Sequence, residues 1–263
     1  MRTHAVHFLA GMPRAGTTLL GNILSQNPII DVTSTSYMYE VVFGMRQAFQ
    51  TSDQRKAQQD HKYAREKFYG AVSGALFGSF LDAPVGIDKN RNWLECFSLI
   101  AKALPQSKII CPVRDIAGVL SSFEKLYQQA PEYPKNEQML TVTDRCQYLL
   151  KNGPLHKSMV LLKSVIDSRV YQDQICFVRY EDLVQQPEKT ARMLYEFLNI
   201  NFPDNFDMRK IPNDLTEHDA IHYPFGEHSS GSMLLPESNN ILPVELQNAV
   251  RESNSWFCKA FNY

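Results

Sequence analysis

The sequence lacks the features that mark a secreted, membrane-spanning or nucleic-acid-binding protein. Its five cysteines are odd in number and widely spaced, and none forms a Cys-x-x-Cys pair, which disfavours a disulfide framework or a metal site. No apolar run approaches the length of a membrane span, and the run before Gly11 is too short for a signal peptide. The net charge of −1 argues against a broad nucleic-acid-binding surface, although a local basic pocket is compatible with it. We therefore expect a cytoplasmic protein with reduced thiols, no membrane span and no nucleic-acid partner.

The composition that remains is that of an ordinary globular protein. Hydrophobic residues make up 44% and charged residues 21% of the 263-residue chain, which is long enough for a substantial core. Such a length fits one large domain or two small ones. Because we find no internal repeat, low-complexity segment or linker, we expect residues 1–263 to form a single domain.

The most informative stretch is residues 4–24. The apolar run from Val6 to Ala10 indicates a buried strand, residues 11–16 form a glycine-containing turn, and Thr17 and Thr18 begin an amphipathic helix. A strand, a glycine turn and a helix in this order direct backbone N–H groups and a helix N-terminus at an anion.

The glycine spacing of this turn matches the phosphate-binding loop GxxxxGK[ST] at every position but one. Thr17 occupies the place of the lysine, and the nearest cation is Arg14, inside the loop. The sequence therefore predicts a loop for a 5′-phosphate or a sulfate whose charge is placed differently from that of an ATPase or a kinase. The alternative is a tight strand-to-helix turn with a capping threonine.

Short apolar strands alternate with helices along the rest of the chain. This alternation predicts an α/β fold in which helices flank a doubly wound parallel sheet. We expect further strands at 29–32, 85–88, 108–113 and 175–178. We expect helices near 37–45, 54–81 (one long helix), 93–104, 116–126, 143–151, 154–168, 187–198 and 243–256, and a long loop region over 203–242.

Polar side chains follow four of the predicted strands. In parallel sheets, ligands bind at the carboxyl ends of the strands. The polar groups expected there are the Arg14 loop, the turn at Asp88 and Lys89, Arg114, and Tyr180. Their convergence predicts one anion-binding site.

Two segments together resemble the cofactor signatures of one family. They are GMPRAGTTLL at 11–20 and SKIICPVRDIAGVLSSFEKL at 107–126. The pair is similar to the two signatures of sulfotransferases that use 3′-phosphoadenosine 5′-phosphosulfate (PAPS), above all the bacterial and tyrosylprotein types with an RxGTT loop. Further matches are the turn at 88–90, VRYEDL at 178–183 and ILPVEL at 241–246. The resemblance implies a phosphate-loop α/β fold, transfer of sulfate from PAPS, and release of 3′,5′-adenosine bisphosphate (PAP).

The resemblance also implies roles for individual residues. The 5′-phosphosulfate would be bound by Arg14, Ala15, Gly16, Thr17 and Thr18, and the 3′-phosphate by Arg114 and Ser122. Tyr180 would lie near the adenine, and Lys89 would stabilise the transferring sulfuryl group. A late loop around Gly226, with His228, Ser229 and Ser230, stands where the family has another cofactor-contacting loop, but it lacks that loop's basic residue.

Each assignment has a plainer alternative. Arg114 could form a helix-start ion pair with Asp115, and Ser122 could be an ordinary surface serine. Tyr180 could be an aromatic at the edge of the core, and Lys89 a solvated turn residue.

Sulfuryl transfer is an in-line displacement, so the protein must position the reactants, neutralise charge and accept one proton. We expect Arg14 and Lys89 to stabilise the sulfuryl and leaving-phosphate oxygens, without a metal. The glutamate that serves as base in the tyrosylprotein type falls on Thr35 here. Glu40 and Asp88 are the rival general bases, and three histidines of the late loop are further candidates: His218, His222 and His228.

Two other functions remain open at this point. The chain could be a small-molecule kinase that uses the phosphate loop, or a non-catalytic PAP- or PAPS-binding protein. The sequence does not identify the acceptor, which could be a small molecule such as a phenol, sugar or lipid, or a peptide, and it does not reveal the oligomeric state.

Overall fold

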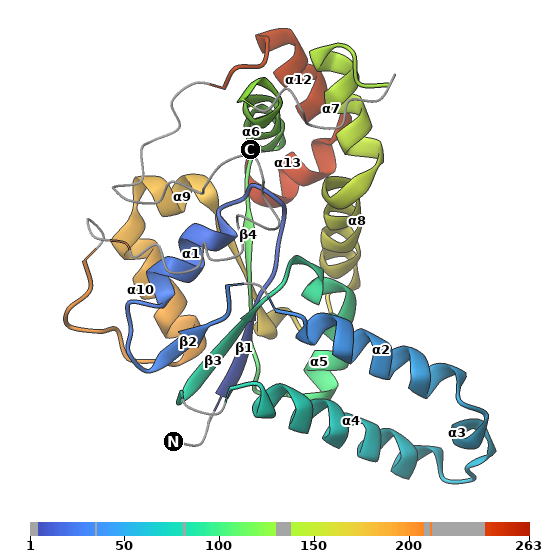
Figure 1. Ribbon diagram of the computed structural model, residues 1–263. Helices are drawn as coiled ribbons and strands as arrows, with labels where there is room; N and C mark the ends of the chain where they lie inside the picture. Colours follow the sequence, from blue (N-terminus) through green and yellow to red (C-terminus); the bar gives the residue numbers. More distant parts are fainter. Residues whose placement is uncertain (1–4, 35, 81–82, 130–137, 208–210, 212–239) are drawn as a thin grey trace.

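A parallel sheet with helices on both faces forms the centre of the molecule (Figure 1). The computed structural model describes residues 5–34, 36–80, 83–129, 138–207, 211 and 240–263. Within them the sheet has five strands in the order β2-β3-β1-β4-β5. The strands are β1 (Ala5–Leu9), β2 (Ile30–Val32), β3 (Val85–Lys89), β4 (Ile109–Val113) and β5 (Ile175–Arg179). This arrangement confirms the predicted fold class and every predicted strand.

Alternate residues of the strands point to opposite faces of the sheet and build two apolar cores. In β1, Phe8 belongs to the larger core and Leu9 to the smaller one. The helices α1 (Thr17–Leu24), α9 (Tyr180–Gln185) and α10 (Pro187–Leu198) contribute to the smaller core. The larger core receives side chains from α2 (Met38–Thr51), α4 (His61–Gly78), α5 (Phe97–Ala103), α6 (Ile116–Gln129), α7 (Val142–Lys151), α8 (Gly153–Ser168), α12 (Val244–Ser253) and α13 (Ser255–Phe261).

The direction in which the sheet is wound reverses at β1. The chain leaves β1 for β2 on one side of the sheet, and after β3 it crosses to β4 on the other side, so that β1 lies between β3 and β4. Ligands of doubly wound sheets bind where the direction of winding reverses in this way. The segments that follow β1, β3, β4 and β5 therefore meet at one edge of the sheet.

The prediction of a single long helix over residues 54–81 is wrong. The structure has two helices there, α3 (Asp53–Ala57) and α4, separated by residues 58–60, of which Gln58 is extended. Asp60 accepts a hydrogen bond from the N–H group of Tyr63 and so begins α4 as a separate helix. Together with α2, these helices form a hairpin that extends away from the sheet (Figure 1).

Three further elements differ from those expected. Residues Arg91–Cys96 form a 3₁₀ helix before α5, and α9 begins directly at the end of β5. The helix expected near the end of the sequence is divided into α12 and α13 at Asn254. Most of the predicted loop region at 203–242 lies outside the described residues.

The five cysteines, all within the described segments, are free thiols, as expected. Burial raises the pKa of the Cys96 and Cys146 thiols to about 11, so both remain protonated. In the part of the chain that the structure describes, no helix has the length and apolarity needed to cross a bilayer.

Candidate functional site

The loop between β1 and α1 adopts a conformation that glycine makes possible. Gly11 and Gly16 have φ angles of 132° and 87°, in the region that favours glycine. A Cβ atom on Gly11 would lie 2.6 Å from the carbonyl oxygen of Pro112, and one on Gly16 would lie 2.8 Å from the Tyr180 ring. The loop is therefore packed tightly against the ends of β4 and β5. Because Gly16, the residue before α1, has no side chain that could cap the helix, the first amide groups of α1 remain suited to an anion.

Arg14 links this loop to the helix that follows β4. Its Nε atom donates a hydrogen bond to the Oγ atom of Ser122 on α6, 2.9 Å away, and its backbone has a positive φ of 61°. The Arg114 guanidinium donates to the carbonyl oxygen of Arg14 at 3.1 Å. The loop and the second predicted motif are thus in contact, in agreement with the predicted convergence of the strand ends.

Tyr180 completes this side of the site. The guanidinium carbon of Arg114 lies 4.3 Å from the centre of the Tyr180 ring, a cation–π contact. The same ring lies beside Gly16. Tyr180 therefore joins the loop between β1 and α1 to Arg114, and its ring is half-buried.

Lys89 lies at the other side of the loop, near the N-terminus of α1. Its Nζ atom donates to the Oγ1 atom of Thr18 at 3.1 Å and to the carbonyl oxygen of Ser34 at 2.7 Å. Its backbone N–H group donates to the Oγ1 atom of Thr33 at 2.8 Å. These contacts fix a cation next to the amide groups of the first turn of α1.

Asp88 and Glu40, the rival bases, occupy different environments. Asp88 is completely buried, and its two carboxylate oxygens accept hydrogen bonds from Ser36 at 2.6 Å and from the Trp93 indole at 2.7 Å. Burial raises the pKa of Asp88 to about 6, a shift that the charge of Glu40 increases and the two hydrogen bonds oppose. Glu40 lies exposed in the first turn of α2.

The structure thus brings together seven of the predicted residues: Arg14, Gly16, Thr18, Lys89, Arg114, Ser122 and Tyr180. Ala15, completely buried, and Thr17 belong to the same loop and helix start. His218, His222, His228, Ser229, Ser230 and Thr35 lie outside the described residues. Sequence reasoning did not find Ser34, Ser36 or Glu181 as supporting residues, because each contacts a partner from another element.

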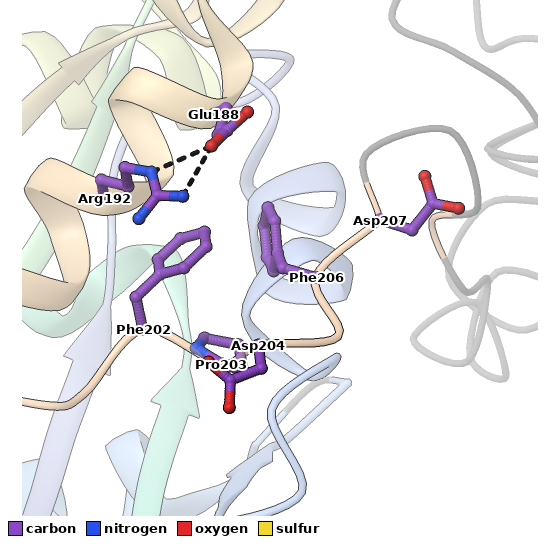
Figure 2. Close-up of a pocket in the computed structure, with 7 residues that line it drawn as sticks. All are labelled: Glu188, Arg192, Phe202, Pro203, Asp204, Phe206 and Asp207. Atoms are coloured by element: carbon purple, nitrogen blue, oxygen red, sulfur yellow. Dashed lines mark hydrogen bonds and ion pairs between the residues drawn. The ribbon is translucent and has the colours of Figure 1, made fainter.

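A pocket of about 580 Å³ lies apart from this site (Figure 2). It is formed by α10 and the segment that follows it, and its lining residues are Glu188, Arg192, Phe202, Pro203, Asp204, Phe206 and Asp207. The guanidinium of Arg192 lies over the Phe202 ring at 4.2 Å and is paired with Glu188. None of the predicted site residues lines this pocket.

Comparison with known proteins gives a consistent result. Residues 7–204 match the model of the sulfotransferase family. The chain is 24% identical over 207 residues to protein-tyrosine sulfotransferase 1 of Danio rerio, a match that covers 75% of this chain and 54% of the relative. The chain therefore spans about half the length of this curated relative.

Two solved structures show the same fold. The sulfotransferase STF9 of Mycobacterium avium is 13% identical, with a TM-score of 0.50, over 97% of this chain and 76% of its own. Retinol dehydratase, in a complex with retinol and PAP, is 12% identical, with a TM-score of 0.51, over 98% of this chain and 82% of its own. Because the family model covers most of the sequence, this chain belongs to the sulfotransferase family.

Proposed function

We propose that this protein transfers the sulfuryl group of PAPS to a hydroxyl or amine of an acceptor and releases PAP. The observation that carries the proposal is the contact of Arg14 with both Ser122 and Arg114, which joins the phosphate loop to the second anion-binding motif. A cofactor with phosphate groups at its 3′ and 5′ positions needs two such anion sites side by side. Family membership and the PAP bound to retinol dehydratase support the choice of cofactor.

In this proposal Arg114 and Ser122 hold the 3′-phosphate, and Tyr180 supports the adenine. A guanidinium can form two parallel hydrogen bonds to a phosphate, and a hydroxyl on the next helix turn can add a third. Arg14, which the resemblance assigns to the 5′-phosphosulfate, contacts Ser122 in this structure. We therefore assign it a position between the two phosphate ends of the cofactor.

Lys89, Thr17 and Thr18 form the sulfuryl end of the proposed site. In the reaction the bond between sulfur and the 5′-phosphate oxygen breaks while a bond forms between sulfur and the acceptor oxygen or nitrogen. Negative charge then increases on the leaving phosphate oxygen. The Lys89 ammonium and the amide groups at the start of α1 are placed to stabilise this charge.

Glu40 is the general base in our proposal, and Asp88 is a positioning residue. Both oxygens of Asp88 accept hydrogen bonds inside the protein, and the group has no exposed surface through which it could reach an acceptor. Through Ser36, which also accepts the Met38 N–H group at 2.9 Å, Asp88 holds the start of α2. Glu40 lies in that first turn, so Asp88 sets its position.

The test begins with the ligand. PAP without metal should raise the melting temperature of the protein, whereas Mg·ATP should not. Incubation with PAPS and a panel of phenols, alcohols, sugars, amines and tyrosine peptides should then yield a sulfated product from at least one class. Stabilisation by Mg·ATP alone would instead favour a kinase. Binding of PAP with no transfer to any acceptor would favour a non-catalytic binding protein.

A further inference from the structure

A hydrogen-bonded pair of side chains, Tyr263 and Glu181, lies against the backbone on both sides of Arg114. The hydroxyl group of Tyr263 lies 3.4 Å from the carbonyl oxygen of Val113 and donates to the Oε2 atom of Glu181 at 2.6 Å. The other carboxylate oxygen of Glu181 accepts the N–H group of Asp115 at 3.1 Å. Glu181 thus holds the N–H group that follows Arg114, while the Tyr263 hydroxyl group, which donates its one proton to Glu181, lies against the carbonyl oxygen that precedes Arg114.

Tyr263 is itself held firmly in place. The guanidinium of Arg179 lies 4.6 Å from the centre of its ring, and the Phe257 ring is stacked on it with an interplanar angle of 2°. Burial and the neighbouring Glu181 carboxylate raise the pKa of Tyr263, so its hydroxyl group stays protonated and remains a donor. Contacts with β5 and α13 therefore fix the position of the Tyr263 ring.

Asp115 adds a second connection to the same end of β4. Its carboxylate accepts two hydrogen bonds from Arg251 on α12, at 3.1 and 2.6 Å. Asp115 also accepts the N–H group of Gly118 at 3.3 Å, in the first turn of α6. The start of α6, the helix that carries Ser122, is thereby tied to α12.

We infer that Tyr263 and Glu181 are positioning residues that set Arg114 for the 3′-phosphate of the cofactor. The inference rests on the proposed function, since it assigns Arg114 to that phosphate. A two-point contact between a guanidinium and a phosphate depends strongly on orientation. Arg114 takes its direction from its backbone, from the ring of Tyr180 and from the carbonyl oxygen of Arg14. Tyr180 directly precedes Glu181, so the same turn of chain holds both the backbone and the side chain of Arg114.

The inference predicts a selective loss of affinity. Tyr263→Phe removes only the hydroxyl group, and Glu181→Gln keeps the volume of the side chain while removing its charge. Each variant should bind PAP roughly three- to tenfold more weakly than the unsubstituted protein, as expected from the loss of one hydrogen bond. The affinity for adenosine 5′-phosphate, which has no 3′-phosphate, should stay the same. Titration calorimetry with the two nucleotides measures both values.

Tyr39→Phe is the matched control, because Tyr39 is a buried tyrosine that also donates to a carboxylate, the Oε2 atom of Glu95 at 2.8 Å. It should lower the melting temperature as Tyr263→Phe does, while the ratio of the two affinities remains unchanged. An equal loss of affinity for both nucleotides in Tyr263→Phe and Glu181→Gln, or no loss in either, would overturn the inference and leave the proposed function intact. If the unsubstituted protein did not prefer PAP to adenosine 5′-phosphate, both the inference and the proposed function would fail.

Discussion

The Nε atom of Arg14 and the Oγ atom of Ser122 are 2.9 Å apart, although 108 residues separate them in the sequence. Their elements are neighbours in the fold, because β1 pairs with β4 and each strand leads into one of the two residues. The resemblance to sulfotransferases assigns the two side chains to opposite ends of one nucleotide. Their contact brings the two predicted anion-binding motifs together.

Arg114→Ala should weaken the binding of PAP by roughly 10- to 100-fold. A charge-assisted hydrogen bond contributes about 1.5–3 kcal/mol, and each 1.4 kcal/mol corresponds to a factor of about ten. Arg192→Ala is the control, because that guanidinium also lies over an aromatic ring, Phe202, but in the separate pocket. Calorimetry should give an unchanged dissociation constant for the control. Equal affinities of both variants would refute the role of Arg114.

Gly16→Ala should abolish tight binding of PAP and lower the melting temperature. The φ of 87° disfavours any side chain, and the new methyl group would lie 2.8 Å from the Tyr180 ring that supports Arg114. Gly70→Ala, inside the exposed part of α4 with nothing within 4 Å, should instead stabilise the protein by about 0.5–1 kcal/mol. Thermal melts with and without PAP compare the two. A Gly16→Ala protein that binds normally would show that the loop does not hold the cofactor.

Lys89→Met should slow the transfer step by roughly 100- to 1,000-fold and change the affinity for PAP only slightly. The ammonium lies with Thr18 at the start of α1, where charge is expected to form on the leaving phosphate oxygen. Lys102→Met, at an exposed position in the last turn of α5, is the control. Single-turnover rates with PAPS distinguish the variants. A rate like that of the control would remove Lys89 from the mechanism.

Glu40→Gln should lower kcat by roughly 100- to 10,000-fold, because an amide cannot accept the acceptor's proton. The affinity for PAP should remain the same. Glu66→Gln, which changes an exposed carboxylate on α4, serves as the control and should keep the full rate. If Glu40→Gln also retained the full rate, a residue other than Glu40 would be the base.

As the pH falls from about 6 to 4, the protonation of His7 should lower the stability of the folded protein and that of Asp88 should raise it. Burial and the charge of Lys108 lower the pKa of His7 to about 4, so its contribution is lost as the pH falls below 6.5. The pKa of Asp88 is raised from 3.8 to about 6, so the folded state binds the extra proton and its contribution falls as the pH rises through this range. The two effects largely cancel in the unsubstituted protein.

Asp88→Asn removes one of these two effects. Between pH 6 and pH 4 the variant should therefore lose about 2 kcal/mol more stability than the unsubstituted protein, since one proton corresponds to about 1.4 kcal/mol per pH unit. Urea unfolding at both pH values measures the difference. Parallel pH profiles would show that Asp88 is ionised at its ordinary pKa.

The sheet and the centre of the site could be predicted because their signals are local. Runs such as Ile109–Val113 are apolar and short, and each polar residue at a strand end lies next to such a run. Once the strands are known to be parallel, their carboxyl ends must lie at one edge of the sheet, which explains why Arg14, Lys89 and Arg114 could be expected to lie near one another.

The remaining features depend on contacts between distant elements. Residues 54–81 favour helix throughout, so the break before α4 depends on a single cap at Asp60. The burial of Asp88 depends on Ser36, 52 residues away, and the contact of Tyr263 with Glu181 joins residues 82 positions apart. No periodicity or spacing in the sequence reports such contacts.

The order of the strands constrains how the protein can assemble during its synthesis. β1 and β2 leave the ribosome before β3, yet they do not pair with each other in the sheet, because both pair with β3. Until β3 has been synthesised, β1 and β2 therefore lack the strand with which they pair. We expect the sheet to nucleate when β3 emerges between them, so that a stalled chain ending before residue 85 would expose both strands to aggregation and to chaperones.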